Sequence, residues 1–198
     1  MNNKAANSSG SKRKNAIRIK KDLEKMNALL ESKEGPFGKG EICFSITGEV
    51  EKLSDIVFRQ SKKGSRQYDV AHAFIQGEEG TPYEGGLFEM KVLIPEDYPL
   101  RSPICQFQIA WYICKTKLFH PKTNLRGDCS HFGQPNDHCE TWKASITIPD
   151  VLLAIHDSLN HPEKNPDHHL WTECYKIFKE NREKFNKTAK DWTQKFAK

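Results

Sequence analysis

The stretch that decides the fold is TPYEGGLFEMKVLIPEDYPLRSP, residues 81–103. Its middle, residues 87–94, alternates aliphatic and aromatic side chains in the manner of a half-buried β-strand. Gly85-Gly86 precedes this run and Tyr98-Pro99 follows it, and both dipeptides are typical of turns. The stretch therefore predicts one strand bounded by two turns.

Further runs with β character lie on both sides of this strand. They are ICFSITGEV, DIVFRQ and YDVAHAFIQ before it and ICQFQIAWYI after it, at residues 42–50, 55–60, 68–76 and 104–113. Residues 61–65 (SKKGS) have the composition of a turn. From these runs we expect a four-stranded antiparallel meander.

Helical patterns flank the strands. Residues 15–31 carry apolar side chains at helical spacing, and GPFG at 35–38 ends that helix. Residues 147–160 predict a buried helix in which Pro149 fits the first turn and Thr147 pairs with Asp150 in a capping box. Two more helices follow, and their apolar positions are Leu170, Cys174 and Phe178, then Phe185, Ala189, Trp192 and Phe196. The order predicts an α+β fold: an N-terminal helix, the meander, then C-terminal helices.

Length and charge narrow the classes of function. The 198 residues suffice for one domain, residues 15–198, preceded by a polar, basic tail at 1–14 that we expect to be disordered. The net charge of +5 resides at the two ends without interleaved exposed aromatics, which argues against nucleic-acid binding. No run approaches the roughly 20 apolar residues of a membrane span, and the N-terminus lacks the apolar core of a signal peptide. We therefore expect a cytoplasmic or nuclear protein whose six cysteines are reduced.

One of those cysteines lies in a distinctive loop, FHPKTNLRGDCSHFGQPNDHCETW, residues 119–142. A His120-Pro121 turn and a Gly127-bounded loop lead to Cys129. A thiolate is a strong nucleophile that carries acyl groups as thioesters. Cys129 is the candidate nucleophile, with an unreactive loop thiol as the alternative and Cys139 as a second candidate.

YEGGLF, then IPEDYPLRSP, then FHP with a following cysteine, in this order, resemble the ubiquitin-conjugating enzymes, the E2 family. The matching segments span residues 16–198. The resemblance implies the fold predicted above, without cofactor or bound metal. It also implies that Cys129 receives ubiquitin or a ubiquitin-like modifier from an E1 activating enzyme and transfers it to a protein substrate lysine or to the cysteine of an E3 ligase.

The site departs from the family pattern at several positions. Lys122 stands where the family has the asparagine of its His-Pro-Asn turn, and His120 is implied to be structural. Either Asn124 or Lys122 would then stabilise the oxyanion, or neither does. His131 lies where many members have an acidic residue near the incoming lysine, so it either assists that amine or is simply solvated.

The resemblance also implies binding surfaces. Leu100 and Arg101 match one loop that contacts RING-type or HECT-type ligases, and Ala144 and Ser145 match the second, in which Ala144 replaces a proline. Arg18 and Lys21 match positions that contact the activating enzyme. The alternatives are a core-facing Leu100 and solvated basic side chains.

Two other classes of function stay open. A catalytically silent relative would bind ubiquitin or a conjugating enzyme as a scaffold. A zinc-binding module would use residues of the long loop, namely Cys129, His131, His138 and Cys139, although their spacing is not a recognised zinc motif.

Overall fold

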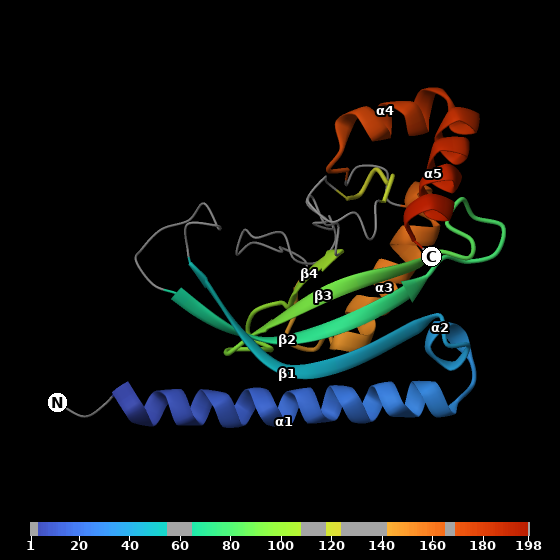
Figure 1. Ribbon diagram of the computed structural model, residues 1–198. Coiled ribbons are helices and arrows are strands. Elements are labelled where there is room, and N and C mark those ends of the chain that lie inside the picture. Colours follow the sequence, from blue (N-terminus) through green and yellow to red (C-terminus); the bar gives the residue numbers. More distant parts are fainter. Residues whose placement is uncertain (1–3, 55–64, 108–117, 124–141, 165–168, 198) are drawn as a thin grey trace.

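Four antiparallel strands form one sheet in the computed structural model of the chain (Figure 1). They are β1 (Ile42–Ser54), β2 (Ser65–Gln76), β3 (Leu87–Pro95) and β4 (Ile104–Phe107), and each pairs with its neighbour in sequence. The predicted meander is confirmed. The structure describes residues 4–54, 65–107, 118–123, 142–164 and 169–197. The run at 55–60 and the second part of the run at 104–113, residues 108–113, therefore lie outside the described residues.

Alternation along the strands places successive side chains on opposite faces of the sheet, and the larger of the two buried clusters lies on one of these faces. In β2, Ala71, Ala73 and Ile75 are fully buried, and in β3 the same holds for Met90 and Val92. Ala71 pairs with Val92 and Ala73 with Met90, so these side chains share one face of the sheet. This face is where the C-terminal helices can bury their apolar stripes.

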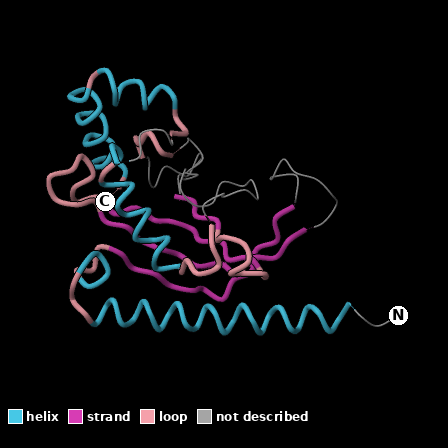
Figure 2. The backbone as a smooth tube through the Cα atoms, turned by 180° about the vertical axis from the view of Figure 1, so that it is seen from behind, coloured by secondary structure: helices cyan, strands magenta, loops and turns pink. Residues whose placement is uncertain are grey.

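The helix α3 (Ile148–Asn160) lies across that face, as the view from behind shows (Figure 2). Its predicted capping box is confirmed, because the Thr147 side chain accepts the Asp150 N–H and the Asp150 carboxylate accepts the Thr147 N–H. Val151, Leu152, Ile155 and Leu159 are buried, which is the apolar stripe expected from the sequence. The helix is thus fixed at its start by the cap and along its length by the core.

Two helices complete the C-terminal part: α4 (Thr172–Glu180) and α5 (Arg182–Phe196). A single 3-10 turn, η1 (Pro162–Lys164), follows α3. Phe185 and Ala189 of α5 are buried as expected, whereas Leu170 precedes α4 instead of belonging to it. Because all of these helices follow the sheet in sequence, the predicted α+β arrangement is confirmed.

The first helix is longer than the sequence pattern predicts. α1 runs from Lys4 to Glu31, whereas we expected a helix from residue 15 after a disordered tail. Residues 4–14 contain no proline, so none of them blocks the backbone hydrogen bonds by which a helix that is already formed extends. The GPFG segment, expected only to end this helix, forms the short helix α2 (Gly35–Gly38).

A buried carboxylate joins α1 to the rest of the domain. Asp22 is 2% exposed and accepts hydrogen bonds from Arg18 Nε at 2.9 Å, from the Ile148 N–H at 3.2 Å and, at short range, from the Tyr98 hydroxyl. One side chain therefore links α1, the loop between β3 and β4, and the first residue of α3. None of the described helices has the length and apolarity that a bilayer crossing requires.

We predict that Asp22→Ala lowers the free energy of unfolding by about 3 kcal/mol, because it leaves the buried Ile148 N–H, the Tyr98 hydroxyl and Arg18 Nε without their shared acceptor. Urea denaturation measures the change. The matched control is Glu24→Ala on the same helix, which removes a solvent-exposed pair with Lys20 at 3.9 Å and is expected to change stability by less than about 0.5 kcal/mol. Equal effects of the two substitutions would contradict the role given to Asp22.

Candidate functional site

The turn at residues 119–123 is held by hydrogen bonds on both sides. The Phe119 carbonyl accepts the Tyr83 hydroxyl at 2.9 Å, and the His120 carbonyl accepts the Thr123 N–H at 3.3 Å and its hydroxyl at 3.2 Å. The Pro121 carbonyl accepts the N–H groups of Leu170 and Trp171 at 2.9 and 3.3 Å. The carbonyls of Phe119, His120 and Pro121 are therefore all occupied, and the turn has little freedom to move.

Aromatic side chains of the C-terminal helices pack against the turn. The Phe119 ring lies 5.2 Å from Trp171, 5.6 Å from Phe185 and 5.4 Å from Trp192, measured between ring centroids. These partners come from the start of α4 and from α5. The C-terminal helices thus serve as the platform on which the His-Pro turn rests.

His120 is neutral and buried. Its ring is 2% exposed, and Nδ1 accepts the Lys122 N–H at 3.1 Å. Burial and the neighbouring Lys122 charge lower the pKa of His120 to about 3, against a smaller opposing effect from the backbone of Ser158 and Leu159. A ring with this pKa stays unprotonated near pH 7 and is too weak a base to take a proton from a reacting group. Its hydrogen bond to the Lys122 N–H indicates that its role is to hold the turn in shape.

Lys122, which we expected in the place of the asparagine of a His-Pro-Asn turn, is also buried. It is 3% exposed, and its Nζ has no hydrogen-bond partner among the residues that the structure describes. Desolvation lowers the pKa of Lys122, although the carboxylates of Asp157 and Glu163 act in the opposite direction. The amine is therefore held inside the domain instead of extending into solvent as a surface lysine would.

Three predicted site residues lie outside the described residues: Cys129, Asn124 and His131. The same is true of His138 and Cys139. Cys129 as nucleophile, Asn124 or Lys122 as oxyanion donor and His131 beside the incoming amine all stay predictions.

Among the other cysteines, burial raises the pKa of Cys105 and of Cys174 to about 12. These two thiols are protonated and enclosed at neutral pH, which makes them poor nucleophiles. Cys43 is exposed at the start of β1. The structure therefore removes two of the six cysteines as competitors for the nucleophile's role.

Tyr83 is a site residue that the sequence analysis did not single out. It is fully buried, lies 5.5 Å from the His120 ring, and burial raises its pKa well above the ordinary value. Gly77 makes room for it, because a Cβ there would lie 1.9 Å from the Tyr83 carbonyl oxygen. The signal in the sequence was an aromatic residue inside the glycine-rich stretch at 81–86, but only the fold shows which carbonyl its hydroxyl reaches.

The predicted ligase-binding residues lie on two neighbouring loops. Leu100 is 78% exposed, so it does not face the core, and Ala144 and Ser145 are exposed as well. Trp142 Nε1 donates to the Pro99 carbonyl at 2.9 Å and thereby joins the two loops. Arg101 is partly exposed and pairs with Asp97 four residues earlier. The structure thus brings Leu100, Ala144 and Ser145 to one region of the surface.

The two predicted contacts to the activating enzyme differ in their surroundings. Lys21 is exposed on α1. Arg18 instead donates to Asp22 and to the Ile146 carbonyl at 2.8 Å, so much of its guanidinium is committed to holding α1 against the second loop. Binding of the activating enzyme by either residue stays a prediction.

Comparisons with known proteins agree on one family. A model of the family described as ubiquitin-conjugating enzyme matches residues 41–193. The chain is 41% identical over 128 residues to the ubiquitin conjugating enzyme E2 B of Dictyostelium discoideum, an alignment that covers 64% of this chain and 76% of the relative. A crystal structure described as a ubiquitin conjugating enzyme of Plasmodium yoelii superposes with a TM-score of 0.60 at 29% identity, covering 93% of this chain and 96% of the other.

The low pKa of His120 predicts a loss of stability in acid. The folded value of about 3 lies below the unfolded value of about 6.5, so the unfolded chain binds the extra proton and stability falls as the pH drops below 6.5. Between pH 7 and pH 5 the expected loss from His120 is about 2 kcal/mol.

The test compares urea unfolding of the wild type and His120→Asn at both pH values. Asparagine can accept the Lys122 N–H through its side-chain oxygen but does not titrate, so the loss on acidification should shrink by about 2 kcal/mol. Burial lowers the pKa of His156 too, so it contributes to acid sensitivity in both proteins and cancels in the comparison. An unchanged dependence on pH would show that His120 titrates normally in the folded state.

Proposed function

Because the chain belongs to the ubiquitin-conjugating enzyme family, we propose that it carries ubiquitin, or a ubiquitin-like modifier, as a thioester on Cys129. The observation that supports this most directly is the turn at residues 119–123, which hydrogen bonds hold in place and which ends six residues before Cys129. A rigid turn fixes the position from which the chain leads to the following cysteine. The partners implied are an activating enzyme, ligases and protein substrates, in the cytoplasm or the nucleus.

The proposed reaction consists of two acyl transfers. The Cys129 thiolate attacks the thioester carbonyl that joins the modifier to the activating enzyme, a new C–S bond forms, and the activating enzyme's thiolate leaves. An amine of a substrate lysine, or a ligase thiolate, then attacks the Cys129 thioester, and the Cys129 thiolate leaves. When the attacking group is an amine, the tetrahedral intermediate must also lose a proton before an amide remains.

Lys122 distinguishes the two routes out of the thioester. Its amine is buried and has no hydrogen-bond partner within the described residues, and an ammonium lacks the paired donor and acceptor of an asparagine amide. When a ligase thiolate attacks instead of an amine, the tetrahedral intermediate has no proton to lose. We therefore propose that this enzyme transfers its cargo to ligase cysteines more readily than to free amines.

The thioester is tested with activating enzyme, ATP and ubiquitin, on gels run with and without reductant. The wild type should give an adduct that reductant removes, whereas Cys129→Ser should give an oxyester that reductant leaves intact. Cys139→Ala is the matched control and should behave as the wild type. No adduct with several modifiers would favour the silent scaffold, and loss of the adduct only in Cys139→Ala would move the nucleophile to Cys139.

The role of Lys122 is tested by Lys122→Asn, which restores the family's residue. We expect discharge of the thioester onto free lysine to accelerate by about a hundredfold, the lower end of what one oxyanion donor contributes in other enzymes. Discharge onto a small thiol should change little. Lys143→Asn, at an exposed lysine on the second ligase loop, is the control. Equal acceleration of both discharge reactions would contradict a specific effect on aminolysis.

A further inference from the structure

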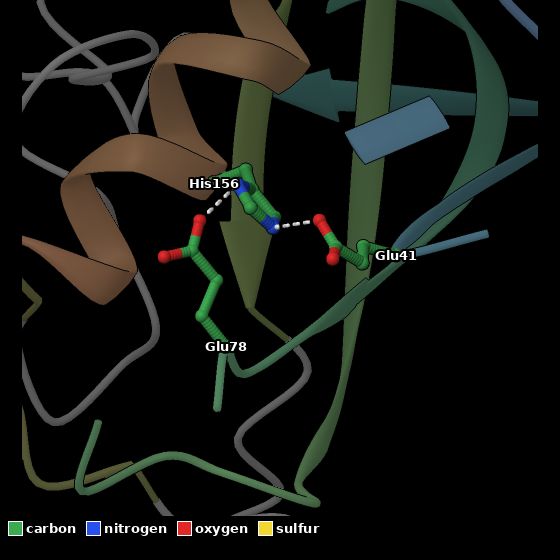
Figure 3. A group of neighbouring side chains, drawn as sticks. All are labelled: Glu41, Glu78 and His156. Atoms are coloured by element: carbon green, nitrogen blue, oxygen red, sulfur yellow. Dashed lines mark ion pairs between the residues drawn. The ribbon is translucent and has the colours of Figure 1, made fainter. Parts of the chain in front are cut away.

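Three side chains from distant parts of the sequence meet at the edge of the core. Glu41 precedes β1, Glu78 follows β2, and His156 lies on α3 (Figure 3). His156 Nε2 is 3.5 Å from Glu41 Oε2, and Nδ1 is 3.6 Å from Glu78 Oε1. The two carboxylates thus approach the imidazole from its two nitrogen atoms, as the close-up shows.

The imidazole is enclosed without a hydrogen bond at Nε2. The His156 side chain is 2% exposed, and its Nε2 has no hydrogen-bond partner within the part of the chain that the structure describes. Both distances to the carboxylates exceed the roughly 2.7–3.2 Å of an N–H···O hydrogen bond. A buried ring nitrogen directed at carboxylates, yet too far to bond them, leaves room for something between the groups.

The spacing fits a small divalent cation. One nitrogen of His156 and one oxygen from each glutamate all lie within 4.8 Å of one another. In a tetrahedral zinc site, ligand bonds of about 2.0–2.1 Å place the ligand atoms about 3.3–3.4 Å apart. The unbonded Nε2 of His156 and Glu41 Oε2, 3.5 Å apart, are already close to that separation. The Glu78 side chain can rotate to bring one of its oxygens to the same ion, since one atom of each of the three residues already lies within 4.8 Å of the others. A single ion would use one of the two ring nitrogens.

We propose that Glu41, Glu78 and His156 form a zinc-binding site. His161 Nε2 lies 3.2 Å from the second oxygen of Glu78 and so helps to hold that side chain in place. Two carboxylates and one imidazole belong to the set of donors that Zn²⁺ accepts. This site is built from other residues than the cysteines and histidines of the long loop, and it does not depend on the proposed thioester chemistry.

The backbone around the site is already fixed. The Glu41 N–H donates to the Pro36 carbonyl at 2.8 Å, and the Glu41 carbonyl accepts the Gln76 N–H at 2.8 Å. The Glu78 N–H donates to the Asn160 side chain at 2.8 Å, and that side chain donates to the His156 carbonyl at 3.0 Å. Asn160 thereby sets the position of Glu78 relative to His156. Supporting bonds of this kind are what holds metal ligands in place.

A bound ion would add a further link between three elements that the hydrogen bonds of Glu41, Gln76, Glu78 and Asn160 already join. Glu41 marks the start of the sheet, Glu78 the turn between β2 and β3, and His156 the helix beneath the His-Pro turn. Because an ion that binds the folded chain stabilises it, zinc at a hundredfold excess over its Kd should raise the Tm by about 5–10 °C.

The experiment is isothermal titration of zinc chloride into the full chain after removal of metal by chelation. We expect one zinc ion per chain in this site. Glu41→Gln and Glu78→Gln keep the shape of the side chain, and both positions are partly exposed, so the domain should remain folded. Each should weaken zinc binding by at least about tenfold and reduce the rise in Tm.

The matched control is His72→Gln. His72 also pairs with a carboxylate, Glu89 Oε1 at 2.9 Å, but this is an ordinary pair on the sheet, and its loss should leave zinc binding unchanged. Cobalt(II) distinguishes the site from the cysteine-containing loop, because thiolate ligands give charge-transfer absorption in the near ultraviolet and carboxylates with imidazoles do not. The proposal is overturned if zinc fails to bind, if Glu41→Gln and Glu78→Gln bind it like the wild type, or if the cobalt spectrum shows thiolate ligation.

Discussion

The domain depends on one buried carboxylate, that of Asp22. It accepts bonds from Arg18, from the Tyr98 hydroxyl and from the Ile148 N–H, and these donors belong to α1, to the loop after β3 and to α3. A charge can be buried there only because each of its neighbours donates to it. Satisfying that one group orients the first helix on the domain and positions the start of the helix that underlies the candidate site.

From that anchor the structure leads to the His-Pro turn. α3 is capped by Thr147 and Asp150, and its far end lies beside His120 through Ser158 and Leu159. The C-terminal helices contribute rings against Phe119, and the Tyr83 hydroxyl holds the Phe119 carbonyl. The turn therefore has support from the sheet side and from the helices. Rigidity of this kind is what a loop bearing a nucleophile requires, since a displaced attacking group loses its advantage of proximity.

Several ionisable side chains are buried in the domain, and they differ in how their polar atoms are bonded or kept neutral. Asp22 is fully bonded, His120 is kept neutral, and Lys122 has an amine whose pKa desolvation lowers. His156 differs from all three, because two carboxylates face it at distances too long for hydrogen bonds. Burial is costly for charges unless they are paired or coordinated, so the last arrangement is the one best explained by a ligand.

Local pattern was enough to predict the meander, the capping box of α3 and the apolar stripes, because strand alternation, caps and helical periodicity are properties of near neighbours in sequence. It also predicted the family, from motifs read in order. It did not predict that α1 begins at Lys4, because residues 4–14 lack the apolar periodicity on which that prediction relied. Nor could it find that Tyr83 reaches Phe119 or that Glu41, Glu78 and His156 meet. Those contacts join residues 36 to 115 positions apart, and only the closing of the sheet against α3 decides which of them touch.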